Sequence, residues 1–320
     1  MEPQLNMLER LIEFGFDPEK IIVLGKTYST NIEVLGELQK KRIKAIQPKF
    51  SGISFDQEHK NNCEAVLKEI PDNARCIVLD DGGELIKAFS KNNRDVLFGV
   101  EQTSSGFRNL EKEILPFPVL NVARSVTKLT QEAPLVARHL NERILAYLNQ
   151  KGVTNPSILI VGLGPIGESI LEAFKQNGTR VEGFDIKYGH TDLIAKIQNL
   201  RPDVIIGATG TSVLTEREVR NINLPQQLFL ISASSSDREF PVVNFRSNEN
   251  VHEDVIYEKT TFVNNGFPFS FMGNRYEMTP IEIEKTMCLL GGAVMYGSTR
   301  DIVGTGLKDI PTELEDLINT

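Results

Sequence analysis

The stretch SILIVGLGPIGESILEAF at residues 157–174 decides the fold. A run of apolar, strand-forming residues passes through Gly162, Gly164 and Gly167 directly into a helical pattern. In a strand–turn–helix of this spacing, the first glycine makes the tight turn, the second lets a pyrophosphate approach the backbone, and the third lets helix and strand pack closely. The free N–H groups at the start of the helix then face the phosphates. The expected phosphate-binding residues are Gly162, Gly164, Pro165, Ile166 and Gly167.

A carboxylate follows at the spacing that a dinucleotide site requires. The next apolar run, RVEGF, leads into Asp185, which lies 23 residues after Gly162. An acid at this place accepts hydrogen bonds from the ribose hydroxyls of NAD and repels the additional phosphate of NADP. Lys187 is a nearby cation that weakens this preference. NAD is therefore the expected cofactor, and the alternative is that the glycines only shape the turn of an α/β domain without a ligand.

A later apolar run ends in Thr209 and Gly210. Because the carboxyl ends of parallel strands face the cofactor crevice, small residues at this place let adenine or ribose pack closely. A plain strand-to-helix turn explains the two residues equally well. Both interpretations stay open from the sequence.

Apolar runs of strand length alternate with amphipathic helical stretches along the chain, the pattern of a parallel α/β fold. Two such series lie on either side of a helical pattern at residues 134–149. We predict an α/β substrate-binding domain at residues 1–132, onto which the helical residues 275–320 pack back. The second domain, at residues 133–274, is predicted to be a Rossmann-type NAD domain with a parallel sheet. Other expected elements are a helix at residues 63–70 and a strand at residues 259–265.

The composition argues against several classes of function. Of 320 residues, 40% are hydrophobic, and the net charge of −8 disfavours a general nucleic-acid binder or a protein that sits on anionic lipid. No apolar run approaches the roughly 20 residues that span a bilayer. The first residues lack the order of a signal peptide, so a cytoplasmic location is expected. The scattered cysteines and histidines favour neither a disulfide framework nor a metal site.

Four further polar motifs follow the predicted strands in a fixed order. They are LDDGG at residues 79–83, EQTSSG at residues 101–106, SVTK at residues 125–128 and VNNG at residues 263–266. Together with the glycine motif, their order and spacing resemble the S-adenosylhomocysteine hydrolase (adenosylhomocysteinase) family. Members of that family have a substrate domain and an NAD domain joined by a hinge, and they form oligomers. The resemblance therefore implies this architecture and a homo-oligomer.

The resemblance implies that the hydroxyl run of EQTSSG, residues 103–105, contacts the cofactor. In the family, the corresponding residues hydrogen-bond the nicotinamide side of NAD, which implies the same contact for Thr103, Ser104 and Ser105. It also implies a cofactor contact for Asn264 of VNNG. Without the resemblance, hydroxyl residues before a helix are typical of an N-cap, so this alternative stays open for the run.

The remaining motif residues imply catalytic chemistry. Lys128 matches the family lysine, and Glu132 follows four residues later, where both side chains can share one helix face. A lysine beside a carboxylate can activate a substrate hydroxyl for oxidation. Asp81 and Glu101 are expected to orient or deprotonate the substrate. Without the family context, a solvated surface ion pair explains Lys128 and Glu132 equally well.

The sequence departs from the family at the residues of the hydrolytic step. One family histidine falls on or near Lys26, a second falls at about Ser235, and a third falls in FPFSF, which contains no histidine. Gln102 stands in place of a family glutamate, and Ala133 in place of an asparagine. Because a carboxylate without an imidazole partner is a poor proton shuttle at neutral pH, we do not expect family-type hydrolysis of S-adenosylhomocysteine.

Two functions therefore remain open. In the first, NAD oxidises a secondary alcohol of a small, nucleoside-like substrate; in the second, the protein is an NAD-binding sensor or subunit without turnover. A third function, that of a 2-hydroxyacid dehydrogenase, requires a histidine paired with an acid and an arginine at the substrate. Arg238 and Arg275 are available, but no histidine is suitably placed, so the third function is not expected.

Overall fold

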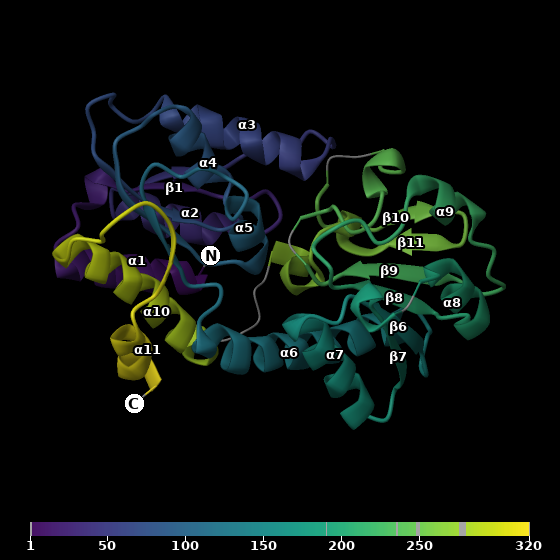
Figure 1. Cartoon of the computed structure of the whole chain (residues 1–320). Helices are drawn as coiled ribbons and strands as arrows, with labels where there is room; N and C mark the ends of the chain where they lie inside the picture. The colour runs from purple at the N-terminus through teal and green to yellow at the C-terminus, as the bar shows by residue number, and fades with distance from the viewer. Residues whose placement is uncertain (1, 190, 235, 248–249, 275–279, 320) are drawn as a thin grey trace. The chain divides into compact units, whose positions relative to one another are not determined.

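The computed structural model describes residues 2–189, 191–234, 236–247, 250–274 and 280–319 (Figure 1). The chain forms two compact units. Unit 1 contains Met1–Lys49, Asp56–Glu132 and Met278–Thr320, and unit 2 contains Phe50–Phe55 and Ala133–Glu277. The assignment of substrate to one unit and NAD to the other stays a prediction.

Unit 1 is built on parallel strands. A two-stranded sheet pairs β1 (Ile22–Leu24) with β2 (Lys44–Ile46). A four-stranded sheet has the order β12-β5-β4-β3, and each neighbouring pair in it is parallel. Its strands are β3 (Cys76–Asp80), β4 (Val96–Glu101), β5 (Pro118–Asn121) and β12 (Gly306–Asp309). Because the strands are parallel, the polar residues that end β3, β4 and β5 lie along one edge of the sheet.

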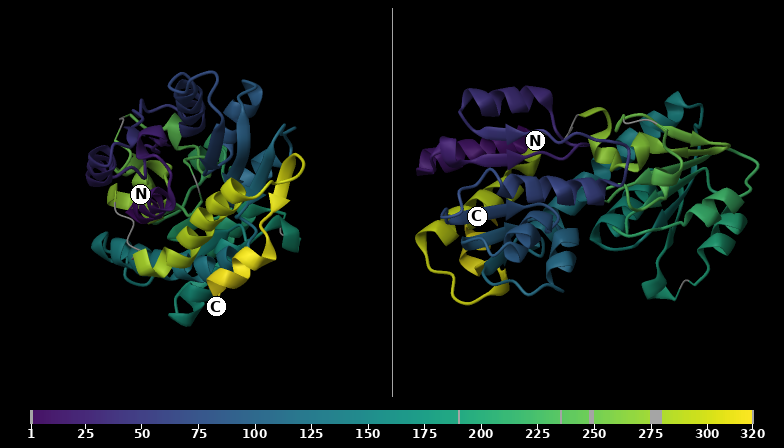
Figure 2. Two further views of the ribbon diagram at one scale, coloured as in Figure 1. Left: turned by 90° about the vertical axis from the view of Figure 1, so that its left-hand side faces the viewer. Right: turned by 90° about the horizontal axis from the view of Figure 1, so that it is seen from above.

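The helices of unit 1 come from both ends of the chain. They are α1 (Glu2–Phe14), α2 (Ile32–Lys40), α3 (Phe55–Leu67), α4 (Glu84–Lys91), α5 (Ser104–Leu110), α10 (Pro280–Thr299) and α11 (Thr312–Asn319). Helix α1 packs against α10, the purple and yellow helices of Figure 2. Val78, Ile86, Phe89, Leu110 and Val119 belong to a buried cluster that joins the sheet to α4 and α5.

Helix α3 begins at Phe55, well before the expected start at residue 63. The residues in between are mostly polar, so they show no apolar stripe in the sequence. Asp56 and Glu58 lie in the first turn, where acidic side chains interact favourably with the helix dipole. The buried Cys63 and Leu67 then anchor the second half of the helix to the core.

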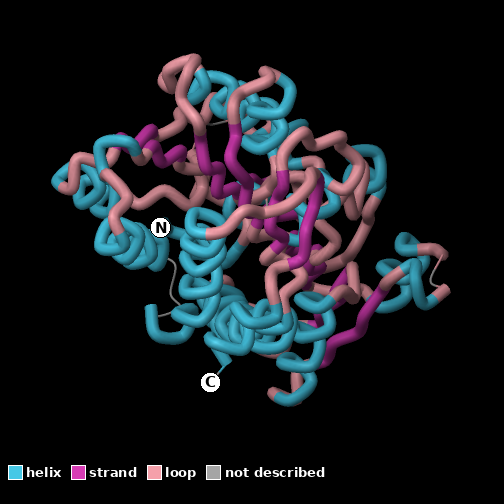
Figure 3. Tube along the Cα trace, turned by 60° about the vertical axis from the view of Figure 1, so that its left-hand side comes forward, coloured by secondary structure: helices cyan, strands magenta, loops and turns pink. Residues whose placement is uncertain are grey.

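Unit 2 contains one six-stranded sheet of order β10-β11-β9-β8-β6-β7. All neighbouring pairs are parallel except β10 and β11, which are antiparallel. The strands are β6 (Ser157–Val161), β7 (Arg180–Phe184), β8 (Val204–Gly207), β9 (Leu228–Ser232), β10 (Val255–Tyr257) and β11 (Thr260–Phe262). The predicted parallel α/β class is thus confirmed in both units, where Figure 3 draws the strands in magenta and the helices in cyan.

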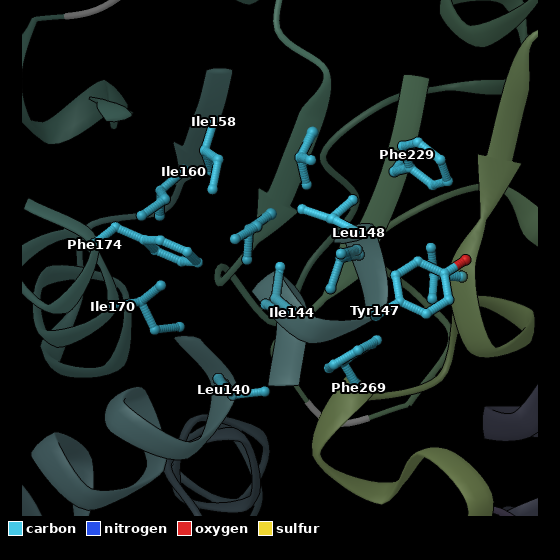
Figure 4. Close-up of a cluster of buried hydrophobic side chains, with 14 of the residues drawn as sticks. Leu140, Ile144, Tyr147, Leu148, Ile158, Ile160, Ile170, Phe174, Phe229 and Phe269 are labelled. Carbon is cyan, nitrogen blue, oxygen red and sulfur yellow. The ribbon is translucent and has the colours of Figure 1, made fainter. Parts of the chain in front are cut away.

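Helices cover both faces of the sheet in unit 2. They are α6 (Ala133–Gln150), α7 (Pro165–Gln176), α8 (Leu193–Leu200) and α9 (Glu216–Asn221). Ile158 and Ile160 point toward α6 and α7, in the cluster shown in Figure 4. Leu159 and Val161, which alternate with them, pack in the cluster that contains residues of α8 and α9. A strand buried on both faces reads as a continuous apolar run, which is why the sequence SILIV identified β6.

The expected strand at residues 259–265 is wrong in its last part. Strand β11 ends at Phe262, and the chain continues as the 3₁₀ turn Val263–Gly266. Within that turn, Asn264 and Asn265 have φ values of 54° and 53°. Asparagine tolerates this left-handed region better than most residues, which the apolar pattern does not reveal. No helix in the described ranges is sufficiently long and apolar to span a membrane.

Candidate functional site

In the glycine turn of unit 2, at residues 162–167, the fold requires glycine at some positions and not at others. Gly162 has a φ of +94°, and a Cβ there would lie 2.7 Å from the side chain of Thr209. A Cβ on Gly167 would collide with the carbonyl oxygen of Gly162. Gly164 differs, because its φ of −79° suits any residue and no described atom beyond its neighbours lies within 4 Å of its Cβ position. The fold itself therefore requires two of these glycines but not Gly164.

The N-terminus of α7 has backbone N–H groups that no capping side chain occupies, as an anion-binding site requires. Gly164 is the N-cap residue and offers no side-chain hydrogen bond, and Pro165 occupies the first turn, where its missing N–H costs nothing. The following residues, Ile166 and Gly167, belong to the first turn, whose N–H groups have no partner within the helix. The positive end of the helix dipole adds to the attraction for a phosphate.

Asp185 ties the end of β7 to this turn. Its Oδ2 accepts from the N–H of Leu163 at 2.6 Å, and its Oδ1 accepts from the N–H of Lys187 at 2.9 Å. An ionised carboxylate oxygen can accept a second hydrogen bond, so the group can hold the turn and bind a diol together. The ammonium of Lys187 contacts the carbonyl of Leu163 and lies 3.2 Å from Glu168 Oε1. The lysine that follows Asp185 by two residues thus pairs its ammonium with Glu168.

The turn that follows β8 is held by Glu239, for which the sequence predicted no such role. Glu239 is completely buried, and its Oε1 accepts from the N–H groups of Thr209 and Gly210 at 2.6 and 3.1 Å. Its Oε2 accepts from the hydroxyl of Ser232 at 2.7 Å. Thr209 and Gly210 therefore lie in a turn whose shape depends on a carboxylate from a distant segment.

Asn264 is also fully buried, and its side chain serves the structure of unit 2. Its Nδ2 donates to the carbonyls of Phe267 and Pro268 at 3.4 and 3.1 Å, and its Oδ1 lies 3.2 Å from His252 Nδ1. Its own N–H donates to Asp254. The cofactor contact that the resemblance implies for Asn264 stays a proposal.

In unit 1, the predicted lysine–glutamate pair forms. Lys128 Nζ lies 3.1 Å from Glu132 Oε2, and only 14% and 19% of the two side chains are exposed. The pair is therefore partly buried rather than solvated. Lys128–Glu132 form the π-helix η2, a rare turn that often occurs at functional sites. Thr286 of α10 donates to the same Glu132 oxygen at 2.9 Å.

Asp81 interacts with two lysines. Lys26 Nζ lies 2.9 Å from Asp81 Oδ1 and 2.6 Å from the carbonyl oxygen of Asp81. Burial alone would raise the pKa of Asp81, but Lys26, with help from Lys128 and a hydrogen bond from Gln102, holds it below its ordinary value. Burial likewise opposes the charge on Lys26, yet Asp81 raises the pKa of Lys26 above its ordinary value. Asp81 is therefore ionised at neutral pH, and Lys26 is protonated.

Two further acids, Asp80 and Glu101, lie at the ends of β3 and β4 and are buried. Burial raises the pKa of Asp80 to about 6, despite hydrogen bonds from the N–H groups of Ile86 and Asp81. Burial and the neighbouring Asp80 raise the pKa of Glu101 well above its ordinary value. Glu101 has no exposed surface, although its motif predicts that it acts on the substrate.

The hydroxyl run begins helix α5. Thr103 is its N-cap residue, accepting from the N–H of Gly106 at 3.0 Å and donating to Glu101 Oε1 at 2.7 Å. Ser105 Oγ lies 3.4 Å from the Thr103 hydroxyl, and Ser104 is exposed. The N-cap interpretation of Thr103 is confirmed, while the contact of the run with nicotinamide stays a proposal.

His59 belongs to none of the predicted motifs, but the structure brings it close to charged residues of unit 1. Its ring is buried at 7% exposure, and burial followed by the charge of Lys26 lowers the pKa of His59 to about 4. Asp81 and Asp56 also act on this histidine. Lys26 and His59 are far apart in the sequence, and no spacing between them predicts an interaction. Only the packing of distant segments brings them together. In the described ranges, no group of His, Cys, Asp and Glu is suited to hold a metal ion.

No protein-family model matches this sequence. Two curated proteins of Mycobacterium tuberculosis, from the strains CDC 1551 / Oshkosh and ATCC 25618 / H37Rv, are each 34% identical to the chain over 319 residues. Both are described as uncharacterized proteins. The match covers 91% of this chain and 61% of each relative, so the chain spans about three fifths of the length of these relatives.

Several solved dehydrogenases resemble the chain loosely. The NADPH-dependent glyoxylate/hydroxypyruvate reductase of Sinorhizobium meliloti is 14% identical, with a TM-score of 0.43 over 89% of this chain and 95% of the other. A 2-hydroxyacid dehydrogenase of Ketogulonicigenium vulgare Y25 is 13% identical, with a TM-score of 0.41 over 91% and 98% of the two chains. At TM-scores this low, the likeness carries no argument about function, and the parallel α/β fold stands on the sheet topology of the chain itself.

Proposed function

We propose that unit 2 binds NAD through the glycine turn and Asp185. The observation that supports this most is Gly164, where neither the backbone nor the surrounding protein requires glycine, but the approach of a pyrophosphate does. Asp185 retains the capacity to accept hydrogen bonds from a ribose diol. Its charge disfavours the additional phosphate of NADP, and Lys187, two residues later in the chain, supplies a cation that reduces this penalty. NAD is therefore the preferred cofactor in this proposal, with weaker binding of NADP.

In this proposal the protein oxidises a secondary alcohol of a small molecule. When bound, NAD supplies the acceptor for a hydride from the carbinol carbon. Lys128 hydrogen-bonds the hydroxyl oxygen, and Glu132, 3.1 Å from the ammonium, takes up the proton that leaves. Asp81, which is partly exposed and ionised, orients the substrate. The products are a ketone, reduced cofactor and a proton held on the Lys128–Glu132 pair.

The adenosylhomocysteinase-like assignment, with a nucleoside-like substrate, rests on the five sequence motifs. Hydrolysis in the family manner is not part of this proposal, because the residue beside Asp81 is a lysine instead of an imidazole. A lysine whose pKa is raised stays protonated at neutral pH and does not shuttle protons. His59 does not replace the missing imidazole, since its pKa is lowered to about 4 and its ring is buried.

The proposal is tested on the purified protein. Mass spectrometry of the released small molecules is expected to find NAD. Adenosine, S-adenosylhomocysteine and sugar alcohols are then added while the absorbance of the reduced nicotinamide is followed. Lys128→Ala is expected to lower the rate of reduction at least about 100-fold. Lys68→Ala, which changes an exposed lysine of unit 1, serves as the matched control and is expected to leave the rate unchanged.

Two other outcomes point to different functions. Bound NAD that no substrate reduces would favour the sensor or subunit without turnover, which the lysine in place of an imidazole beside Asp81 supports. Reduction by 2-hydroxy acids would favour a 2-hydroxyacid dehydrogenase, the activity named for the loosely similar protein of Ketogulonicigenium vulgare. Of the arginines considered for that reaction, Arg238 donates to Ser236, and Arg275 lies outside the described residues. The homo-oligomer that the resemblance implies is checked by light scattering.

A further inference from the structure

Three polar residues form a row at one edge of the sheet in unit 1. Asp80, Glu101 and Asn121 are the last residues of β3, β4 and β5, and they are in register with one another. Residues in register on neighbouring parallel strands point to the same face, and the strands lie roughly 4.8 Å apart. The three residues are 5%, 0% and 2% exposed. Glu101 is therefore in the middle of a buried row, with an acid on one side and an amide on the other.

The two oxygens of Glu101 have different surroundings. Oε1 accepts from the N–H of Gly82 at 3.2 Å and from both the N–H and the hydroxyl of Thr103 at 2.7 Å. Oε2 is buried, and no hydrogen-bond donor among the described residues reaches it. The side-chain oxygen of Asn121 is buried in the same condition. Buried oxygens normally have a hydrogen-bond donor. A proton on one of these two neighbouring oxygens, donated to the other, would satisfy both.

The charges around Glu101 determine which acid of the row carries the proton. Asp80 accepts N–H groups on both oxygens, from Asp81 at 2.7 Å and from Ile86 in the first turn of α4 at 2.9 Å. These donors stabilise a negative charge on Asp80. Asp81 is also ionised, and its partner Lys26 donates to Asp81 rather than to Glu101. A third negative charge on the middle member of the row would be repelled by both aspartates.

We propose that Glu101 is a neutral carboxylic acid in the native protein, with its proton on Oε2 donated to the side-chain oxygen of Asn121. In this state Glu101 is a positioning residue. It joins the Asp81–Gly83 turn to the start of α5 through Gly82 and Thr103, and it adds no negative charge beside Asp81. Gly106 belongs to the same arrangement, because a Cβ there would collide with the Glu101 carboxyl group. The link to catalysis depends on the proposed function, whereas the protonation state does not.

Infrared spectroscopy of the full chain tests the protonation state directly. Protein labelled with ¹³C at the glutamate side-chain carboxyl is compared with the labelled Glu101→Gln variant at pH 7. A protonated-carboxyl C=O band that shows the isotope shift and is missing from Glu101→Gln is expected. Asn121→Leu is expected to move that band to higher frequency, because the hydrogen bond to the amide oxygen is lost. Asn109→Ala removes an amide that donates to the carbonyl of Gly82, and as the matched control it is expected to leave the band unchanged.

The inference is overturned if wild type and Glu101→Gln differ only in the carboxylate bands. That result would mean that Glu101 is ionised and that the Asn121 amide is turned to donate its N–H to it. A second measurement separates position from charge. Glu101→Gln keeps the size of the acid and a donor toward Asn121, so the thermal midpoint is expected to stay close to that of wild type, while Glu101→Ala lowers it. The reverse order of the two variants would contradict the neutral acid.

The proposed function has a separate readout. If the protein reduces NAD, Glu101→Gln is expected to keep the pH profile of the rate, because a neutral group replaces a neutral group. Glu101→Asp, which is too short to reach both turns, is expected to lower the rate without weakening NAD binding. The infrared result stands whether or not turnover is found, so failure of the proposed function and failure of this inference are distinguishable.

Discussion

At the scale of single residues, the fold does not require glycine at Gly164, whereas the proposed NAD site does. Gly162 and Gly167 are fixed by backbone conformation and by close contacts within the turn. Gly164 has neither constraint, and its open Cβ position lies at the start of α7. A side chain at this residue would fill the space in front of the helix N-terminus without disturbing the protein.

Gly164→Val is therefore expected to fold normally and to lose NAD. The thermal midpoint without cofactor should remain within the error of wild type, while calorimetric titration should show at least about a 100-fold weaker affinity. Gly167→Ala is the contrasting variant, since its Cβ collides with the carbonyl of Gly162 and should lower the midpoint. Unchanged NAD affinity in a folded Gly164→Val protein would refute the dinucleotide site.

His59 makes a second prediction, which concerns pH. The pKa of His59 falls from 6.5 in the unfolded chain to about 4 in the native protein, so the unfolded chain binds the proton more tightly. The stability that the neutral ring contributes is complete above pH 6.5 and is lost as the pH falls toward 4. The shift corresponds to about 3 kcal/mol.

The measurement compares the free energy of unfolding of wild type and His59→Gln between pH 7 and pH 4. Wild type is expected to lose about 3 kcal/mol more than the variant over this range. The raised pKa of Asp80, about 6, acts in the opposite direction, because stability is lost as the pH rises through that value. Asp80 is present in both proteins, so its effect cancels in the comparison. Parallel pH curves would show that His59 is not buried as a neutral ring.

At the scale of elements, buried glutamate side chains hold the turns that follow parallel strands. In unit 1, Glu101 of β4 accepts from the turn after β3 and from the start of α5. In unit 2, Glu239 accepts from the turn after β8 and from Ser232 at the end of β9. Backbone N–H groups converge at these strand ends, and the oxygens of one carboxyl group accept from several of them together.

Glu239→Ala is expected to lower the free energy of unfolding by at least about 3 kcal/mol, because it leaves several buried donors without an acceptor. Urea denaturation followed by fluorescence or circular dichroism measures this change. Glu172→Ala, at an exposed position of α7, is the matched control and should stay within about 0.5 kcal/mol of wild type. Equal stability of the two variants would mean that Glu239 does not hold the turn.

At the scale of the whole molecule, each unit has its own parallel strands and its own buried core. A ligand that binds only the folded form stabilises the part of the protein that it contacts. NAD is therefore expected to act on unit 2 first. At about 100 times its dissociation constant, it should stabilise the fold by about 2.7 kcal/mol.

Hydrogen exchange measured with and without NAD tests this expectation within unit 2. The largest protection is expected in the glycine turn at residues 162–167 and around Asp185, where backbone N–H groups meet phosphate and ribose. A cavity of about 410 Å³ lies between α8 and α9 and is lined in part by Ile197 and Leu224. Its lining includes neither the glycine turn nor Asp185, so its residues serve as the internal reference. Protection centred on this cavity would place the cofactor elsewhere.

The amino-acid sequence by itself determined the parallel α/β class and the glycine turn. Both depend on local spacing, since a strand buried on two faces is a continuous apolar run and a phosphate turn needs glycines at set intervals. It also predicted the Lys128–Glu132 pair, whose members are one helical turn apart. Only the tertiary structure showed that Lys26 pairs with Asp81 and that Glu239 accepts a hydrogen bond from Thr209. Those contacts join distant segments, and burial, which sets the pKa values of Glu101 and His59, exists only when such segments pack together.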